Sequence, residues 1–184
     1  MSAARRFLVL LDIALMLAWI TMAIVVYDRL PASIPTHFGP SGAADAFADR
    51  SIGSWFALTT IGVCVTSMVL GLAHIAHRRP AMYNVPGKEE MLSLPQDARR
   101  PFVEQLAMFM TVVATGVMLL FAAIQFDMWR VATTDQRGLS AVSWSVMGVF
   151  FCGMLLGLPV WLMRFQRGVS AAHRTLAAGA RRGL

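Results

Sequence analysis

The stretch LPASIPTHFGPSGAADAFADR, residues 30–50, separates two long apolar runs and concentrates residues that are capable of specific chemistry. Its three prolines fix φ and remove backbone donors, and its two glycines admit positive φ. These features predict an ordered, irregular loop rather than a helix or a strand. Because they also restrict the free chain, the order of the loop is expected not to depend on a ligand.

Around this loop, the chain is far more apolar than a soluble domain. It is 57% hydrophobic and 14% charged, whereas soluble domains use about 45–50% apolar residues. Four apolar segments reach the length of about 20 residues that a bilayer requires, and they are 7–27, 55–77, 106–129 and 142–164. Continuous runs favour helices over alternating barrel strands. The prediction is an all-α integral membrane four-helix bundle formed by one domain, residues 1–184.

Basic residues predict the orientation of this bundle. Twelve of the 16 Lys and Arg residues precede the first segment, lie in the connection 78–105, or lie at the end of the fourth segment and beyond it. The other four are Arg29, Arg50, Arg130 and Arg137. Since cytoplasmic loops carry the excess of Lys and Arg, both termini and the basic tail 165–184 are predicted to be cytoplasmic, and the loop 28–54 external. Tyr27, Trp55 and Trp129 then fall at the outer interface.

The connection and the tail have their own local signals. A turn at 84–87 precedes Lys88–Leu92, which is predicted to form a short amphipathic helix, and residues 96–105 are predicted to extend the third span. Pro159 is expected to kink the fourth span. The net charge of +6 lies beside apolar spans without a basic face interleaved with aromatics, which favours anionic headgroups over nucleic acid as a partner.

The pattern L-P-x-x-I-P-T-H-F-x-x-x-G-x-x-D-x-x-x-x-R over residues 30–50 resembles a bacterial membrane family, the domain of unknown function numbered 1648. Its relatives include SdpI-type immunity proteins. The resemblance implies a protein of a few helices in the bacterial inner membrane, with this loop after the first helix. For SdpI-type members it implies protection against a membrane-active peptide toxin and signalling to a repressor, and it implies no catalytic residue.

Four residues of the loop are candidate ligand-binding residues, namely His37, Asp45, Asp49 and Arg50. An imidazole and two carboxylates suit binding of a metal, a peptide or a proton, with the guanidinium as a counter-charge. The alternative is a loop that satisfies itself. In that case the two carboxylates cap turns or a short helix over 43–48, and the imidazole bonds one of them or a backbone carbonyl.

Three carboxyl or amide side chains lie inside the apolar runs, those of Asp12, Gln125 and Asp127. Intramembrane ionisable groups are costly, so Asp12 is a functional candidate. The alternative is that it snorkels to the inner surface or pairs with a basic residue such as Arg78 or Arg164. Gln125 is expected to hydrogen-bond another helix, and Asp127 is expected to approach the loop.

Small residues recur in two similar segments, 61–72 and 147–158, which are identical at six of twelve positions. The similarity indicates either two related helical hairpins or chance resemblance between apolar segments. The alignment superposes a set of small residues that is predicted to make close helix contacts, within the bundle or across a dimer. This set is Ser67, Gly71, Gly153 and Gly157.

The remaining reactive residues give no positive signal for catalysis. His74 and His77 share a helix face but lack a third ligand, so a solvated pair is expected and no metal. Cys64 and Cys152 lie in apolar runs, which does not indicate a disulfide framework. There is no nucleophile–base set and no phosphate-binding motif, so neither an enzyme nor a cofactor is expected.

The function predicted from these observations is non-enzymatic recognition of, or immunity to, an external membrane-active agent in a bacterial inner membrane. The alternatives are an accessory structural subunit of a larger membrane complex and a small transporter that uses Asp12. The expected partners are the lipid bilayer, a peptide ligand, and a larger complex or homo-oligomer.

The predicted orientation is testable by cysteine labelling of Ser41→Cys and Ser170→Cys variants. A probe that cannot enter the cytoplasm is expected to react at position 41 and not at position 170. The reverse pattern would show that the orientation is inverted.

Overall fold

The computed structural model describes residues 1–182, so the last two residues of the predicted basic tail lie outside the described residues. In chain order the elements are α1 (Ala3–Tyr27), strands β1 (Ser33–Phe38) and β2 (Ala44–Asp49), α2 (Ile52–Arg78), the 3-10 turn η1 (Pro80–Met82), α3 (Lys88–Ser93), α4 (Gln96–Thr133), α5 (Ala141–Cys152), the π-helical turn η2 (Gly153–Gly157) and α6 (Leu158–Arg182).

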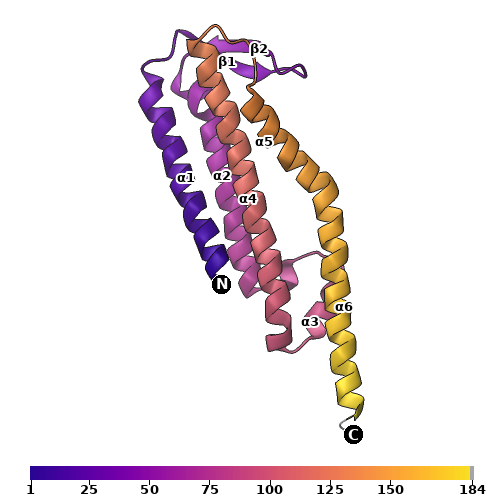
Figure 1. The fold of residues 1–184 in the computed structure, drawn as a ribbon. Coiled ribbons are helices and arrows are strands. Elements are labelled where there is room, and N and C mark those ends of the chain that lie inside the picture. The colour runs from indigo at the N-terminus through magenta and orange to yellow at the C-terminus, as the bar shows by residue number, and fades with distance from the viewer. Residues whose placement is uncertain (183–184) are drawn as a thin grey trace.

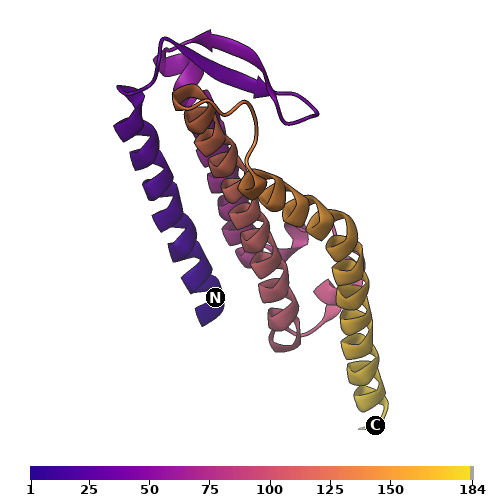
Figure 2. The ribbon, with the colours of Figure 1, turned by 45° about the horizontal axis from the view of Figure 1, so that its top comes forward.

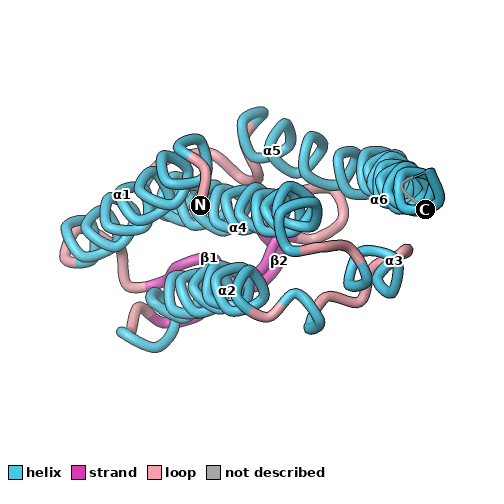
Figure 3. Tube along the Cα trace, turned by 90° about the horizontal axis from the view of Figure 1, so that it is seen from below, coloured by secondary structure: helices cyan, strands magenta, loops and turns pink. Residues whose placement is uncertain are grey.

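Four helical stretches of residues 1–182 are long and apolar enough to cross a membrane, which confirms the predicted helical bundle. They are α1, α2, α4 and the continuous run α5–η2–α6. Viewed along the bundle, α4 lies between α1 and α5 and packs on α2 (Figure 3). Both termini lie at one end of the bundle and the β-strands at the other (Figure 1).

The helices extend beyond the predicted spans because polar residues cap them outside the apolar runs. The hydroxyl of Ser2 accepts from the Arg5 amide at the start of α1, and Ser51 and Ser54 form a reciprocal capping box at the start of α2. At the end of the bundle that holds the termini, α4 begins at Gln96, as predicted for the extension of the third span. The predicted amphipathic helix is α3.

The prediction of an irregular loop over residues 30–50 is wrong, because the segment forms an antiparallel β-hairpin. Its register pairs Ser33 with Asp49, and it shifts on either side of His37. The prolines are compatible with this hairpin because both strands of a two-stranded sheet are edge strands, where a missing backbone donor is tolerated. Pro31 precedes β1, Pro35 pairs with Phe47 beside the register shift, and Pro40 lies in the turn.

The hairpin is held on the bundle by an apolar core at its base. Buried residues from α1, the turn after it, β1, α2 and α4 form this core, and they are Ala23, Leu30, Ile34, Trp55 and Met128. Trp55 was expected at the outer interface, but it is fully buried and donates its indole N–H to the Ala23 carbonyl oxygen at 2.8 Å. A buried indole needs such an acceptor, so this bond ties α2 to α1.

At the opposite end of the bundle, α3 joins α4 to α6. Met91 of α3 and Val169 of α6 are both fully buried, and they belong to a core completed by residues of α2, α4 and α6 and by Tyr83, which follows η1. Phe165 lies edge-on to Phe102 and stacks on Trp161 in this region. The connection between α2 and α4, which contains α3, therefore packs against α6 and supports the end of the fourth span.

The fourth span bends at η2, where five residues adopt π-helical hydrogen bonding (Figure 2). Pro159 lies just beyond this turn, in α6. A proline ring blocks the regular bond to the preceding turn, and a π turn absorbs the mismatch. The predicted kink is confirmed, and it changes the direction of the helix axis between α5 and α6.

The prediction that Ser67, Gly71, Gly153 and Gly157 make helix contacts within the bundle is wrong. A Cβ added at any of the three glycines meets no atom within 4 Å, and Ser67 is exposed. The two similar segments also differ in backbone conformation, since 61–72 is a regular helix and 153–157 is a π turn. Small size alone did not identify the packed face, because no neighbouring helix comes close to these three glycines.

Two other glycines make the close contacts. A Cβ at Gly62 would overlap the Trp19 ring and lie 2.9 Å from the Phe121 Cβ, and a Cβ at Gly116 would lie 2.7 Å from the Phe150 ring. Gly62 therefore sets the approach of α1 and α4 to α2, and Gly116 sets the approach of α5 to α4.

Gly62→Ala is expected to destabilise the bundle by about 1–3 kcal/mol, because the added methyl group overpacks three helices. Gly71→Ala is the matched control in the same helix. It adds a methyl group in open space and is expected to be neutral or stabilising by up to about 1 kcal/mol. Thermal unfolding in detergent measures both, and equal melting temperatures for the two variants would contradict the assigned packing face.

Candidate functional site at the hairpin end

The tip of the hairpin is attached to the segment that precedes α5. The Ala44 amide donates to the Arg137 carbonyl oxygen at 2.9 Å, and the Leu139 amide donates to the Gly42 carbonyl oxygen at 2.8 Å. Gly138 permits this approach, since a Cβ there would lie 2.5 Å from the Gly42 oxygen. Gly42 itself has φ +80° and faces the Trp144 ring. The hairpin thus reaches across the bundle to α5.

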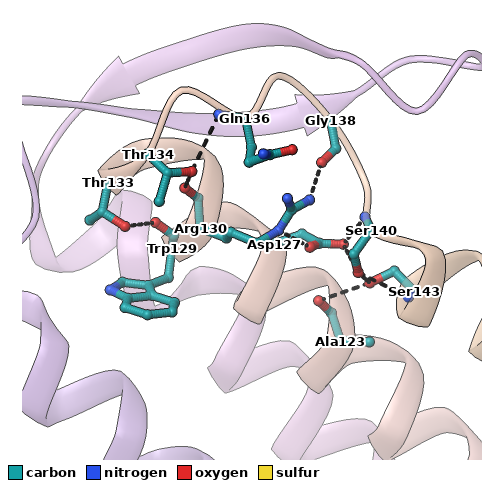
Figure 4. A network of polar contacts seen from close by, with 10 residues as sticks. All are labelled: Ala123, Asp127, Trp129, Arg130, Thr133, Thr134, Gln136, Gly138, Ser140 and Ser143. Atoms are coloured by element: carbon teal, nitrogen blue, oxygen red, sulfur yellow. Dashed lines mark hydrogen bonds and ion pairs between the residues drawn. The ribbon is translucent and has the colours of Figure 1, made fainter.

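A buried carboxylate organises this attachment (Figure 4). Asp127 is fully buried on α4. One carboxylate oxygen accepts from the Arg130 guanidinium at 2.9 Å, and the other accepts from the Ser140 amide at 2.8 Å and hydroxyl at 3.1 Å. The guanidinium also donates to the Gly138 carbonyl oxygen at 2.5 Å. Asp127 therefore reaches the hairpin indirectly, through Arg130 and the segment that pairs with Gly42.

His37 and Asp45 face each other across the two strands. The Nδ1 atom of His37 lies 2.5 Å from a carboxylate oxygen of Asp45, and both side chains are at least half exposed. This contact is one of those predicted for a self-satisfied loop. The short helix predicted as an alternative for 43–48 is absent, because these residues lie in or beside β2. Asp49 is exposed at the far end of that strand.

Arg50 holds the base of the hairpin together. Its guanidinium donates to the Leu30 carbonyl oxygen at 2.6 Å and to the Asp28 carbonyl oxygen at 3.3 Å. It also lies over the Tyr27 ring, 5.8 Å from the centroid. Because its guanidinium donates to carbonyl oxygens just after α1, Arg50 ties the end of β2 to the segment that enters β1.

A groove of about 660 Å³ lies beneath the hairpin, between α2, α4 and α5. Most of its lining is apolar. The hairpin contributes residues 36–40, and the helices contribute Ala57, Leu58, Ile124, Met128, Trp144 and Met147 among others. The groove is therefore an apolar cleft that is bounded on one side by β1 and the hairpin turn.

Below the hairpin, buried polar residues continue along the helix interfaces. Gln125 is fully buried and donates to the Trp55 carbonyl oxygen at 3.2 Å, while its own oxygen accepts from the Thr59 hydroxyl at 3.2 Å. The prediction that Gln125 bonds another helix is confirmed. These bonds tie α4 to α2 in the apolar part of the bundle.

Asp12 lies deeper still, and neither of its predicted structural roles occurs. It is fully buried, so it does not snorkel, and it forms no ion pair with Arg78 or Arg164. Neither carboxylate oxygen has a hydrogen-bond partner of acceptable geometry. The Thr115 side chain of α4 lies beside it, but that hydroxyl donates to the Thr111 carbonyl oxygen at 3.1 Å.

A second polar cluster occupies the end of the bundle that holds the termini. Arg5 of α1 is almost completely buried and lies 3.6 Å from the carboxylate of Glu104 on α4. His77 of α2 lies 3.4 Å from the same oxygen, without hydrogen-bond alignment, and the Ser2 amide donates to the other oxygen at 2.6 Å. Burial raises the pKa of the nearby Tyr83 phenol, which keeps it neutral.

No group of three or more His, Cys, Asp or Glu side chains is placed to hold a metal ion within residues 1–182. Cys64 and Cys152 are free and exposed on the helices. His74 is exposed, while its neighbour His77 turns toward Glu104. The two histidines therefore do not act as one solvated pair.

These features define a multi-pass helical membrane protein whose first two spans are joined by a hairpin that caps the bundle. The chain carries a domain of the family described as Domain of unknown function (DUF1648), which matches residues 13–61. That segment comprises most of α1, the complete hairpin and the first part of α2. No curated protein and no solved structure matches the chain.

Several side-chain contacts at the two polar clusters were not predicted from the sequence. Arg130 lies three residues after Asp127, a spacing that places the two side chains on one helix face, so this pair was open to prediction. Arg5 and Glu104 are 99 positions apart, and only the packing of α1 on α4 brings them together. The distinct environments of His74 and His77 likewise depend on the position of α4.

Asp127→Ala is expected to loosen the hairpin end, because it leaves Arg130 and Ser140 without their buried acceptor. Breaking one side of a buried ion pair costs about 3–5 kcal/mol. Limited trypsin digestion measures the effect as faster cleavage after Arg137. Asp135→Ala removes an exposed carboxylate nearby and serves as the control. Equal cleavage rates in the two variants would contradict the role of Asp127.

Proposed function

We propose that this protein is a non-enzymatic inner-membrane protein that binds an external membrane-active agent, in the manner of SdpI-type immunity proteins. The observation that carries the proposal is the apolar groove beneath the hairpin, which is lined by α2, α4, α5 and residues 36–40. An apolar cleft at the end of a membrane bundle suits the apolar face of an amphipathic helix.

The placement of charge supports this proposal. Both termini and the connection through α3 lie at one end of the bundle, and the hairpin lies at the other. The end with the termini carries the excess of basic residues, so the hairpin end is the external one under the positive-inside rule. Its exposed carboxylates, Asp45 and Asp49, suit a cationic peptide.

Preorganisation of the groove supports a binding role as well. The hairpin is fixed at its base by Arg50 and at its tip by the pairing with residues 137–139. A cleft between rigid elements binds with a smaller entropic cost than a mobile loop. The attachment through Asp127 therefore serves recognition by holding the roof of the groove in place.

Ala57→Phe tests the proposal by filling the groove from α2, where Ala57 is exposed and lines the cleft. Cells that express the protein are challenged with a cationic amphipathic helical peptide of about 20–30 residues. Survival of the Ala57→Phe strain is expected to fall to that of cells without the protein. Thr60→Phe is the control, since Thr60 is exposed on the same helix and does not line the groove. Equal protection by wild type and Ala57→Phe would refute the groove as the binding site.

A further inference from the structure

The interior of the bundle contains polar groups that neither the hairpin nor the groove uses. Asp12 and Thr66 are both fully buried, and Trp19 is 4% exposed. The carboxylate oxygens of Asp12, the hydroxyl of Thr66 and the indole N–H of Trp19 all lack a hydrogen-bond partner. Buried polar groups are normally paired, so three such residues between α1 and α2 require an explanation.

These residues occupy neighbouring levels of the bundle. The Trp19 ring meets α2 at Gly62. Because α1 and α2 are antiparallel, Thr66 lies one turn further toward the N-terminal end of α1, which is the direction of Asp12. On the α4 side, Thr115 lies beside Asp12. The unpaired groups therefore line one stretch of the interface between α1, α2 and α4.

The charge state of Asp12 follows from the absence of a counter-charge. The charged or titratable groups that face this interior toward the termini are Arg5 of α1, His77 of α2 and Glu104 of α4, and toward the hairpin they are Asp127 and Arg130 of α4. Arg5 and His77 both contact Glu104, and Arg130 contacts Asp127. None of these groups pairs with Asp12 among the described residues. An ionised carboxylate in an apolar interior without a partner is very costly, whereas a protonated carboxyl is far less so.

A polar route connects Asp12 with the end of the bundle that holds the termini. A cavity of about 620 Å³ opens there, and its lining includes Ser2, His77, Arg99 and Glu104. Glu104 contacts Arg5, and the Arg5 guanidinium donates to the Thr111 hydroxyl at 3.4 Å. Thr111 lies one turn from Thr115, which adjoins Asp12. Polar side chains thus extend from the cavity to the carboxyl.

From this arrangement we infer that Asp12 is a proton-binding site inside the membrane, reached from the terminal end of the bundle along the path lined by Glu104, Thr111 and Thr115. Arg5 stays protonated and orders this path by contacting Glu104 and the Thr111 hydroxyl. The ligand is a proton, which adds to one carboxylate oxygen and leaves by the same route. A metal cation would require several oxygen ligands, and no cluster of carboxylates surrounds Asp12 within residues 1–182. This site is separate from the groove of the proposed function, so either assignment can fail without the other.

Infrared spectroscopy of the full-length protein in vesicles tests the protonation of Asp12. At neutral pH the wild type is expected to show the carbonyl stretch of a protonated carboxylic acid, and Asp12→Asn is expected to lose it. Asp12→Glu is expected to retain the band at a shifted frequency, which separates loss of the acid from loss of the fold. Asp135→Asn is the control and should leave the band unchanged. Retention of the full band in Asp12→Asn, or its absence from the wild type, would overturn the assignment.

Hydrogen–deuterium exchange tests the route. After transfer to deuterated buffer the acid band shifts as the carboxyl exchanges its proton, and Thr111→Val is expected to slow this shift several-fold. Thr60→Val, which alters an exposed threonine of α2, is expected to match the wild type. Equal rates in Thr111→Val and wild type would refute the route. Loss of the band on adding sodium at constant pH would instead identify a cation site and overturn the proton assignment.

Discussion

The buried Asp127 carboxylate is the interaction on which the hairpin end of the molecule depends. It accepts bonds from Arg130 on its own helix and from Ser140 at the start of α5. Arg130 in turn fixes the Gly138 carbonyl, whose segment pairs with the hairpin tip. In a medium without water every backbone polar group needs a protein partner. One carboxylate therefore satisfies groups from two helices and places the roof over the groove.

The DUF1648 segment is structurally incomplete without the rest of the chain. It supplies most of α1, the hairpin and the beginning of α2. However, its buried Ile34 and Trp55 pack against Met128 of α4, and the hairpin tip bonds the segment before α5. The third and fourth spans thus provide the surface on which the hairpin lies. The proposed binding groove exists only where these two halves of the chain meet.

Polar side chains in the interior of the bundle also need protein partners, but one of them has none. Gln125 and Asp127 find partners, and their bonds hold helices together. Asp12 finds none, although Arg5 lies on the same helix seven residues earlier. Arg5 is instead engaged by Glu104 and Thr111. Arg5 is consequently not the counter-charge of Asp12, and Asp12 is left as a group suited to bind a proton.

The sequence by itself determined the four spans, the amphipathic α3, the bend near Pro159 and the helix-bonding role of Gln125. These features depend on local composition and on hydrophobic length, which the bilayer imposes on each segment separately. Only the tertiary structure decided that residues 30–50 form a hairpin, because their pairing is stabilised by Ile34 in the bundle core and by Gly138 at the tip. It also decided which glycines are packed and that Asp12 has no partner. Such features depend on which faces of distant helices meet, and a continuous apolar run does not encode its own inward face.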